Sequence, residues 1–223
     1  MKVTIARQAV AVVRRDLGRE RRSGEVVWVT IPFGAVGVLL LPLAVGPDSA
    51  LLARIGAGVF WVVVMLFGVL TAMRRTAAET AEQRDVEALL GIDPVASFAG
   101  RASTTAILLV AFEVVVGAVT VVLYDLALDR WPVMLVLVPG VAAGLAMLGT
   151  FSASIVASLS VGPALVPFLV APLSVPLLLA ATAALDPLAT GKGILGWLLL
   201  MVAVDLVLAI AGVLAARPLM ETR

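Results

Sequence analysis

Six uncharged apolar runs, each about as long as a membrane-crossing helix, dominate this chain of 223 residues. A bilayer core about 30 Å thick needs roughly 20 apolar residues to cross it as a helix. The runs extend approximately over 26–45, 55–73, 102–124, 132–159, 163–185 and 194–216. None alternates polar and apolar residues as the strands of a membrane β-barrel do. We therefore expect an all-α, polytopic membrane protein whose single transmembrane domain (1–223) is a bundle of six helices.

Composition excludes much of enzyme chemistry. Hydrophobic residues make up 62% of the chain and charged residues 14%, too apolar a mixture for a soluble domain. The chain has no Cys and no His, which removes disulfides, thiolate metal sites and the commonest general base. It also has no Gly-x-x-x-x-Gly-Lys-Ser/Thr loop for nucleotide phosphates. We predict no catalytic residues, no cofactor-binding residues, no metal ligands and no nucleic-acid partner, and therefore not an enzyme.

The distribution of basic residues predicts the orientation. Of the 16 Lys and Arg residues, all but Arg54, Arg130 and Lys192 fall on the side of the N-terminus when the spans are alternated across the membrane. Because basic loops stay in the cytoplasm, we expect both termini and residues 74–101 to be cytoplasmic. Trp131, Trp197 and Tyr124 are expected at the outer membrane interface.

Residues 1–25 precede the first apolar run and have a helical pattern of their own. Val3, Ala6, Val10, Val13 and Leu17 repeat at helical spacing, with arginines between them. This pattern predicts an amphipathic helix on the inner membrane surface. The alternative is a basic tail that serves only to orient the chain.

Residues 74–101 form the one sizeable polar insertion between spans. Its acidic and basic residues nearly balance, and Val86, Leu89 and Leu90 give a short apolar stripe on a helix that Gly91 and Pro94 should end. Such a helix suits docking into a groove of a soluble partner. The alternative is a solvated linker helix that rests on lipid headgroups.

Three blocks carry a family resemblance. The helix with Glu87-Ala88-Leu89-Leu90, then Pro94 and Gly100-Arg101, resembles the coupling segment of six-span exporter-type ABC permeases. The first outer loop and second span resemble those of the heme exporter B (CcmB) family in Leu51, Leu52, Arg54, Gly56, Gly58 and Trp61. The fifth span is similar to that family's in Pro172-Leu173-Ser174-Val175-Pro176. One departure is Arg84-Asp85-Val86, which stands where the family usually has Gly before its Glu.

This resemblance implies a role and a set of partners. The chain would be the permease subunit of an ABC transporter in a bacterial cytoplasmic (inner) membrane, acting in c-type cytochrome assembly. Heme is the implied cargo, through either heme export or ATP-driven release of a heme-loaded chaperone. The implied partners are a separate CcmA-like ATPase that uses ATP, CcmC-like and CcmD-like membrane subunits, and a second copy or related chain. Residues implied to couple to the ATPase are Glu79, Glu82, Val86, Glu87, Leu89, Leu90 and Pro94.

Two carboxylates lie inside the predicted spans. Glu113 and Asp205 are near mid-bilayer, where an ionised carboxylate costs about 2.5–3.5 kcal/mol on insertion scales. We expect both to face the bundle interior, either as hydrogen-bonding groups between helices or along a polar path.

Span five contains Pro163, Pro167, Pro172 and Pro176, which predict kinks.

Two other functions are compatible with these features. The first is an exporter permease of similar build for a lipid, drug or glycan. The second is a stand-alone proton-coupled transporter that uses Glu113 and Asp205.

Gly140 and Gly144 form a small-xxx-small face, which predicts close helix packing in span four.

Overall fold

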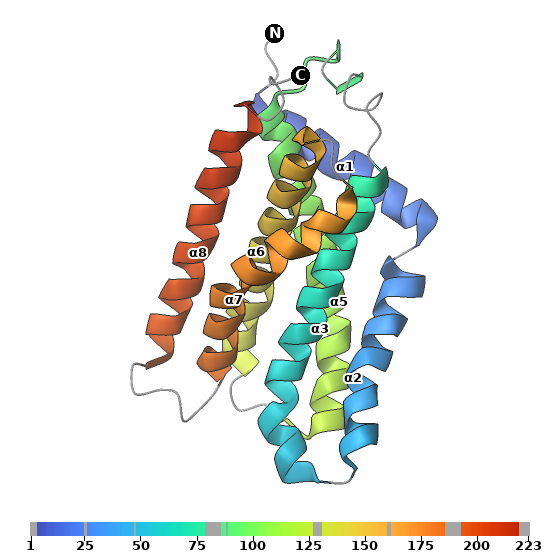
Figure 1. The fold of residues 1–223 in the computed structure, drawn as a ribbon, viewed down its shortest axis with the longest axis vertical. Helices are drawn as coiled ribbons and strands as arrows, with labels where there is room; N and C mark the ends of the chain where they lie inside the picture. The colour runs from blue at the N-terminus through green and yellow to red at the C-terminus, as the bar shows by residue number, and fades with distance from the viewer. Residues whose placement is uncertain are drawn as a thin grey trace.

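A computed structural model describes residues 4–24, 26–46, 48–78, 86–87, 89–126, 131–159, 162–185 and 193–218. Within these ranges every regular element is a helix. The long helices run side by side as a bundle, and the first helix lies across one end of it (Figure 1). The all-α prediction is therefore confirmed.

Seven α-helices account for most of the described chain. Their bounds are α1 Ile5–Ser23, α2 Ile31–Val45, α3 Ser49–Ala78, α5 Pro94–Tyr124, α6 Trp131–Ser158, α7 Val166–Leu185 and α8 Gly193–Ala216. A π-helical turn, Val26–Thr30, precedes α2, and a 3₁₀ turn, Pro163–Leu165, precedes α7. Among the described residues, six segments are long and apolar enough to span a membrane, as predicted.

Two of these helices begin earlier than the apolar runs suggested, because acidic residues cap them. The Asp93 carboxylate accepts a hydrogen bond from the Val95 N–H at 2.8 Å, and Pro94 then occupies the first turn of α5. The Asp48 carboxylate likewise accepts from the Leu51 N–H at 3.0 Å, next to the start of α3. The sequence predicted that Pro94 would help to end the preceding helix. In the structure Pro94 instead starts α5.

Helix α7 crosses the bundle obliquely in its first half and then bends to run along its neighbours (Figure 1). Pro172 and Pro176 lie inside it. Each removes a backbone donor and disfavours the straight helix, which accounts for the bend. Both prolines are exposed on the bundle surface, whereas Ser174 between them is buried.

Glycines allow close helix packing where the sequence predicted it. A Cβ at Gly140 would meet the Met201 side chain, and one at Gly144 would meet Leu177 of α7 and the Asp205 carboxylate of α8. Gly56 allows α3 to pack closely on Tyr124 at the end of α5, since a Cβ at Gly56 would lie 2.9 Å from the Tyr124 Cβ. Gly58 has no neighbour within 4 Å of such a position.

Tyr124 ends its span, as predicted, but the prediction that its side chain faces the membrane interface was wrong. Its side chain is fully buried, and its hydroxyl donates a 2.9 Å hydrogen bond to the Val38 carbonyl of α2. The reason lies four residues beyond Val38, where Pro42 has no N–H to donate within α2. Tyr124 supplies the donor that Pro42 lacks, and so joins α5 to α2.

Replacing Tyr124 with Phe should therefore destabilise the bundle. The Val38 carbonyl would be left buried without this donor, which costs about 1–3 kcal/mol. The free energy of unfolding of the purified chain in mixed micelles measures the loss. An unchanged value would show that Val38 needs no donor from α5. The control is Pro42→Ala with Tyr124→Phe, because restoring the α2 donor should recover part of the stability.

Candidate functional site

The described part of residues 86–93, which leaves out residue 88, meets α1, the start of α5 and the end of α8 at one end of the bundle, which we call the basic end. One helical turn is closed there by the Leu90 N–H, which donates to the Val86 carbonyl at 3.0 Å. Gly91 follows with a φ of +66°, a left-handed conformation that ends the turn. The chain then reaches Asp93, the cap of α5.

Gln8 of α1 holds the second half of this segment. Its side-chain amide donates to the Gly91 carbonyl at 3.2 Å and accepts from the Asp93 N–H at 3.0 Å. The Asp93 carboxylate also pairs with Arg217, just after α8, at 3.3 Å. Three helices far apart in sequence are thus joined at Gly91 and Asp93.

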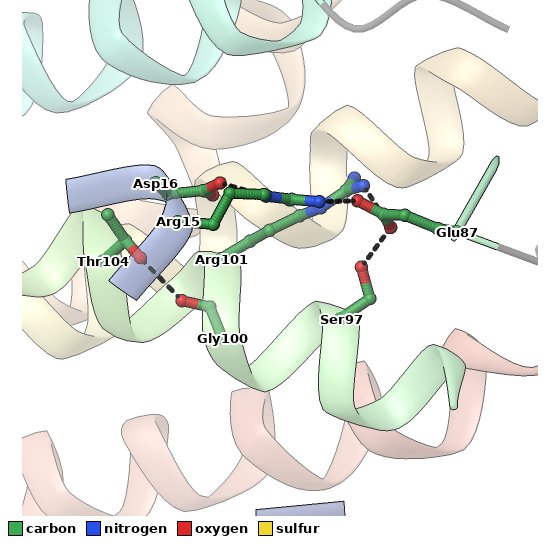
Figure 2. Close-up of polar contacts among 7 residues, drawn as sticks. All are labelled: Arg15, Asp16, Glu87, Ser97, Gly100, Arg101 and Thr104. Carbon is green, nitrogen blue, oxygen red and sulfur yellow. Dashed lines mark hydrogen bonds and ion pairs between the residues drawn. The ribbon is translucent and has the colours of Figure 1, made fainter. Parts of the chain in front are cut away.

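The first half of residues 86–93 is bound to the bundle through Glu87, whose side chain is buried. The Glu87 carboxylate accepts from the Arg15 guanidinium at 2.7 Å and from the Arg101 guanidinium at 2.9 Å. The Ser97 hydroxyl donates to it at 2.9 Å. Figure 2 shows these side chains converging on the carboxylate from α1 and α5. We call Glu87, Arg15, Arg101 and Ser97 the Glu87 cluster.

The Glu87 cluster favours the charged form of its carboxylate. Burial by itself would raise the pKa of Glu87, but the Arg101 charge and the hydrogen bonds from Arg15 and Ser97 outweigh it and lower the pKa below the ordinary 4.5. The pKa of Arg15 is in turn raised, since its bonds to Glu87 and Asp16 outweigh its partial burial.

This lowered pKa predicts an acid transition. A depressed carboxylate pKa contributes stability above the unfolded value near 4.5, and that stability disappears as the pH falls through the folded value. We expect α1 to loosen only below that pH. A spin label at Ala11→Cys, an exposed position of α1 in a chain without cysteine, should become mobile only as the pH falls below about 4.5. The same transition in Glu87→Gln would contradict the assignment to Glu87.

The apolar side chains of the segment point away from this cluster. Val86, Leu89 and Leu90 are 52%, 87% and 70% exposed, against 4% for Glu87. We call these three residues the apolar patch. The structure therefore separates the residues that the sequence grouped for coupling: the patch faces outward, Glu87 faces α1 and α5, and Pro94 lies in the first turn of α5. Glu79 and Glu82 lie outside the described residues.

Sequence reasoning missed Gln8, Arg15, Ser97 and Arg101 as members of the site. Arg15 was interpreted only as one of the arginines between the apolar positions of residues 1–25, and Arg101 only as part of the Gly100-Arg101 step into span three. Gln8 and Ser97 were not singled out. One sequence feature could have indicated these partners. Glu87 lies between Val86 and Leu89 in the sequence, so on a helix it is on a different face from the apolar stripe. A polar residue there needs partners when the turn packs on the bundle.

The close packing of α1 on α5 completes the basic end. A Cβ at Gly100 of α5 would lie 2.6 Å from the Val12 Cβ and 2.9 Å from the Ala9 carbonyl oxygen. Val12 is itself buried. Because no side chain separates α1 from the α5 backbone here, α1 cannot move closer to α5 without displacing the start of α5.

The two intramembrane carboxylates are placed on different helices. Glu113 of α5 is 1% exposed, which confirms that it faces the interior, and within the described residues neither of its carboxylate oxygens has a hydrogen-bond partner. The Oδ1 atom of Asp205 packs on Gly144 of α6 and is also buried without a partner there. No hydrogen bond joins the two groups.

Comparison with known proteins gives the family of this bundle. The family model described as CcmB protein matches residues 7–221, which includes α1 from Arg7 onward and every later helix. The chain belongs to the CcmB family. A heme exporter protein B of Bradyrhizobium diazoefficiens is 32% identical over 184 residues, 81% of this chain and 82% of the relative.

Two further CcmB-family relatives agree. The heme exporter protein B of Haemophilus influenzae is 25% identical over 78% of this chain and 80% of its own length. The protein of that name in Rhodobacter capsulatus is 29% identical over 76% of this chain and 78% of its own length. Membership extends over nearly the whole bundle, so the resemblance seen in the second and fifth spans reflects the complete fold.

Proposed function

We propose that this CcmB-family chain is the permease subunit of an ABC transporter that handles heme during the assembly of c-type cytochromes. Family membership and relatives named heme exporter protein B support this role. The excess of Arg at the basic end supports a cytoplasmic location for that end, with the chain in a bacterial inner membrane. The chain contributes transport, and a separate CcmA-like subunit hydrolyses ATP.

The ATPase docks on the apolar patch. Leu89 is 87% exposed at the basic end, beyond the ends of the spanning segments, where water rather than lipid would meet it. Burying a Leu side chain against a partner stabilises the contact by about 1.5–3 kcal/mol. A patch fastened to three helices by Glu87, Gln8 and Asp93 can transmit a push, which a freely hinged patch could not.

The push would travel by two routes. Through Glu87 it reaches Arg15 of α1 and Arg101 of α5 together, and through Asp93 it reaches the end of α8. Helix α5 then spans the membrane to Tyr124, which is bonded to α2. The bent helix α7 packs against α3 and α6 and offers a place where the far end can rearrange.

Heme handling needs partners with axial ligands. This chain has no His and no Cys, two of the usual ligands of heme iron, so CcmC-like and CcmD-like subunits or a heme-loaded chaperone would hold the iron. A second copy or a related chain would complete the transporter core. In this proposal the CcmB-family subunit converts ATPase motion into a change at the opposite membrane face.

Replacing Leu89 with Ser tests the docking proposal. The ATPase should co-purify about tenfold less in mild detergent, because a buried Leu contact is lost. Cellular c-type cytochrome content should fall with it. The matched control is Ile5→Ser, which removes a hydrophobic side chain 45% exposed at the same end. Unchanged ATPase recovery in Leu89→Ser would reject the docking surface.

The cargo is tested separately. Deletion of the gene should abolish mature c-type cytochromes, since no other step in the proposal supplies them with heme. Normal c-type cytochromes in the deletion strain, together with ATPase binding by the purified chain, would reject heme as cargo while leaving the permease role standing.

A further inference from the structure

Helix α1 has one face that belongs to the bundle. Gln8, Val12 and Arg15 point to α5 and to residues 86–93, where Gln8 and Arg15 make their bonds and Val12 is 2% exposed. These residues recur three and four positions apart, which places them along one side of the helix.

The opposite face carries an unusual alternation. Arg7, Val10, Arg14, Leu17 and Arg21 also recur three and four positions apart, so arginine and aliphatic side chains alternate along a single row. We call these five residues the Arg row. Arg7, Arg14 and Arg21 are exposed, and Val10 is 51% exposed.

The arginines of the Arg row differ from Arg15 in their partners. Arg15 pairs with Glu87 and Asp16. Within the part of the chain that the structure describes, Arg7, Arg14 and Arg21 have neither a hydrogen bond nor an ion pair. Three charges in register are thus available to an anionic surface.

The position of α1 identifies that surface. The helix lies across the end of the bundle (Figure 1) and is followed directly by the first spanning segment, which begins at Val26. Near the start of that segment the Trp28 indole, 79% exposed, lies against Gly24. Exposed Trp at the end of a span marks the headgroup level of a bilayer, so α1 ends at that level.

We propose that the Arg row binds the phosphate groups of anionic phospholipids, with Val10 and Leu17 inserted at the boundary between the headgroups and the acyl chains. Arginine stems lie well along apolar surface while their guanidinium groups reach outward to phosphate, which they bind with paired N–H donors. Since Arg15 on the other face of the same helix holds Glu87, bound lipid also fixes the position of the apolar patch. The inference does not depend on which cargo the permease handles.

A fluorescent probe on the Arg row tests this in the full chain reconstituted into vesicles. The chain has no Cys, so an environment-sensitive dye at Val10→Cys reports one site only. In phosphatidylcholine vesicles with increasing phosphatidylglycerol we expect a blue shift of the dye. In Arg7→Gln/Arg14→Gln, the phosphatidylglycerol fraction at half-maximal shift should rise at least fivefold, since each basic residue near an anionic surface contributes roughly a fivefold effect.

Matched variants separate this from a general loss of charge or fold. Arg19→Gln/Arg22→Gln removes two charges from α1 off the row and should behave as the parent, and Arg7→Lys/Arg14→Lys should retain most of the shift. A full shift in pure phosphatidylcholine, a shift produced by inorganic phosphate alone, or equal losses in the two Gln pairs would overturn the proposal. Unchanged lipid dependence with loss of a co-purifying acidic protein would assign the row to that protein instead.

Discussion

Replacing Glu87 with Gln is expected to release α1 from residues 86–93. The neutral amide keeps the size of the side chain but removes the carboxylate that the Arg15 and Arg101 guanidinium groups share, and of its two ion pairs Arg15 keeps the one with Asp16. Removing one partner of a fully buried pair costs about 3–5 kcal/mol, and we expect about 2 kcal/mol here because the Arg15 side chain is 36% exposed. The detached population of α1 should rise about 30-fold, given about 1.4 kcal/mol per factor of ten.

The mobile fraction of a spin label at Ala11→Cys measures that population. The matched control is Asp16→Asn, which removes an acid whose one bond in the described structure goes to its neighbour Arg15 within α1. This variant should leave the label as immobile as in the parent. Equal mobility in both variants would mean that Glu87 has no special part in holding α1. In cells, Glu87→Gln should reduce c-type cytochromes while the exposed apolar patch still binds the ATPase.

Replacing Gly100 with Leu is expected to separate α1 from α5. Even the first carbon of the new side chain would lie 2.6 Å from the Val12 Cβ and 2.9 Å from a backbone oxygen of α1, so the helices have to move apart. Overpacking costs about 1–3 kcal/mol, and moving α1 also lengthens the bonds of Gln8 and Arg15. The Ala11 spin label should become mobile, and c-type cytochrome content should fall.

The control for this substitution is Gly196→Leu. Gly196 lies in α8, and a Cβ there would meet nothing within 4 Å. Leu has a higher helix propensity than Gly by up to about 1 kcal/mol, so this variant should be neutral or more stable. If Gly100→Leu were equally harmless, α1 would not be packed on α5 as described.

The sequence predicted the parts of the fold that depend on hydropathy and spacing. Six spans followed from apolar length, and the close packing at Gly140 and Gly144 followed from their spacing. Span ends were less accurate, because Asp48 and Asp93 cap helices whose first turns are more polar than the rest. Composition alone gives no position for a cap.

The basic end could not be predicted, because its bonds join distant positions. Glu87 pairs with Arg15, 72 residues earlier, and Gln8 reaches Asp93, 85 residues later. No local pattern encodes which of the arginines of α1 faces a single carboxylate. The prediction that the Tyr124 side chain faces the membrane interface was wrong for a similar reason. An aromatic residue at the end of a span is usually interfacial, and only the fold places Tyr124 beside the carbonyl that Pro42 leaves without a donor.

Cross-linking from Leu89 tests the central claim, that an ATP-hydrolysing partner pushes on the apolar patch. In native membranes, Leu89→Cys carrying a short photo-reactive linker should form a product with the ATPase subunit. Leu43→Cys, 69% exposed near the end of α2 and away from the basic end, should form none. Labelling of Leu89→Cys from outside the cell by a membrane-impermeant thiol reagent, or products that contain no ATPase, would contradict the account.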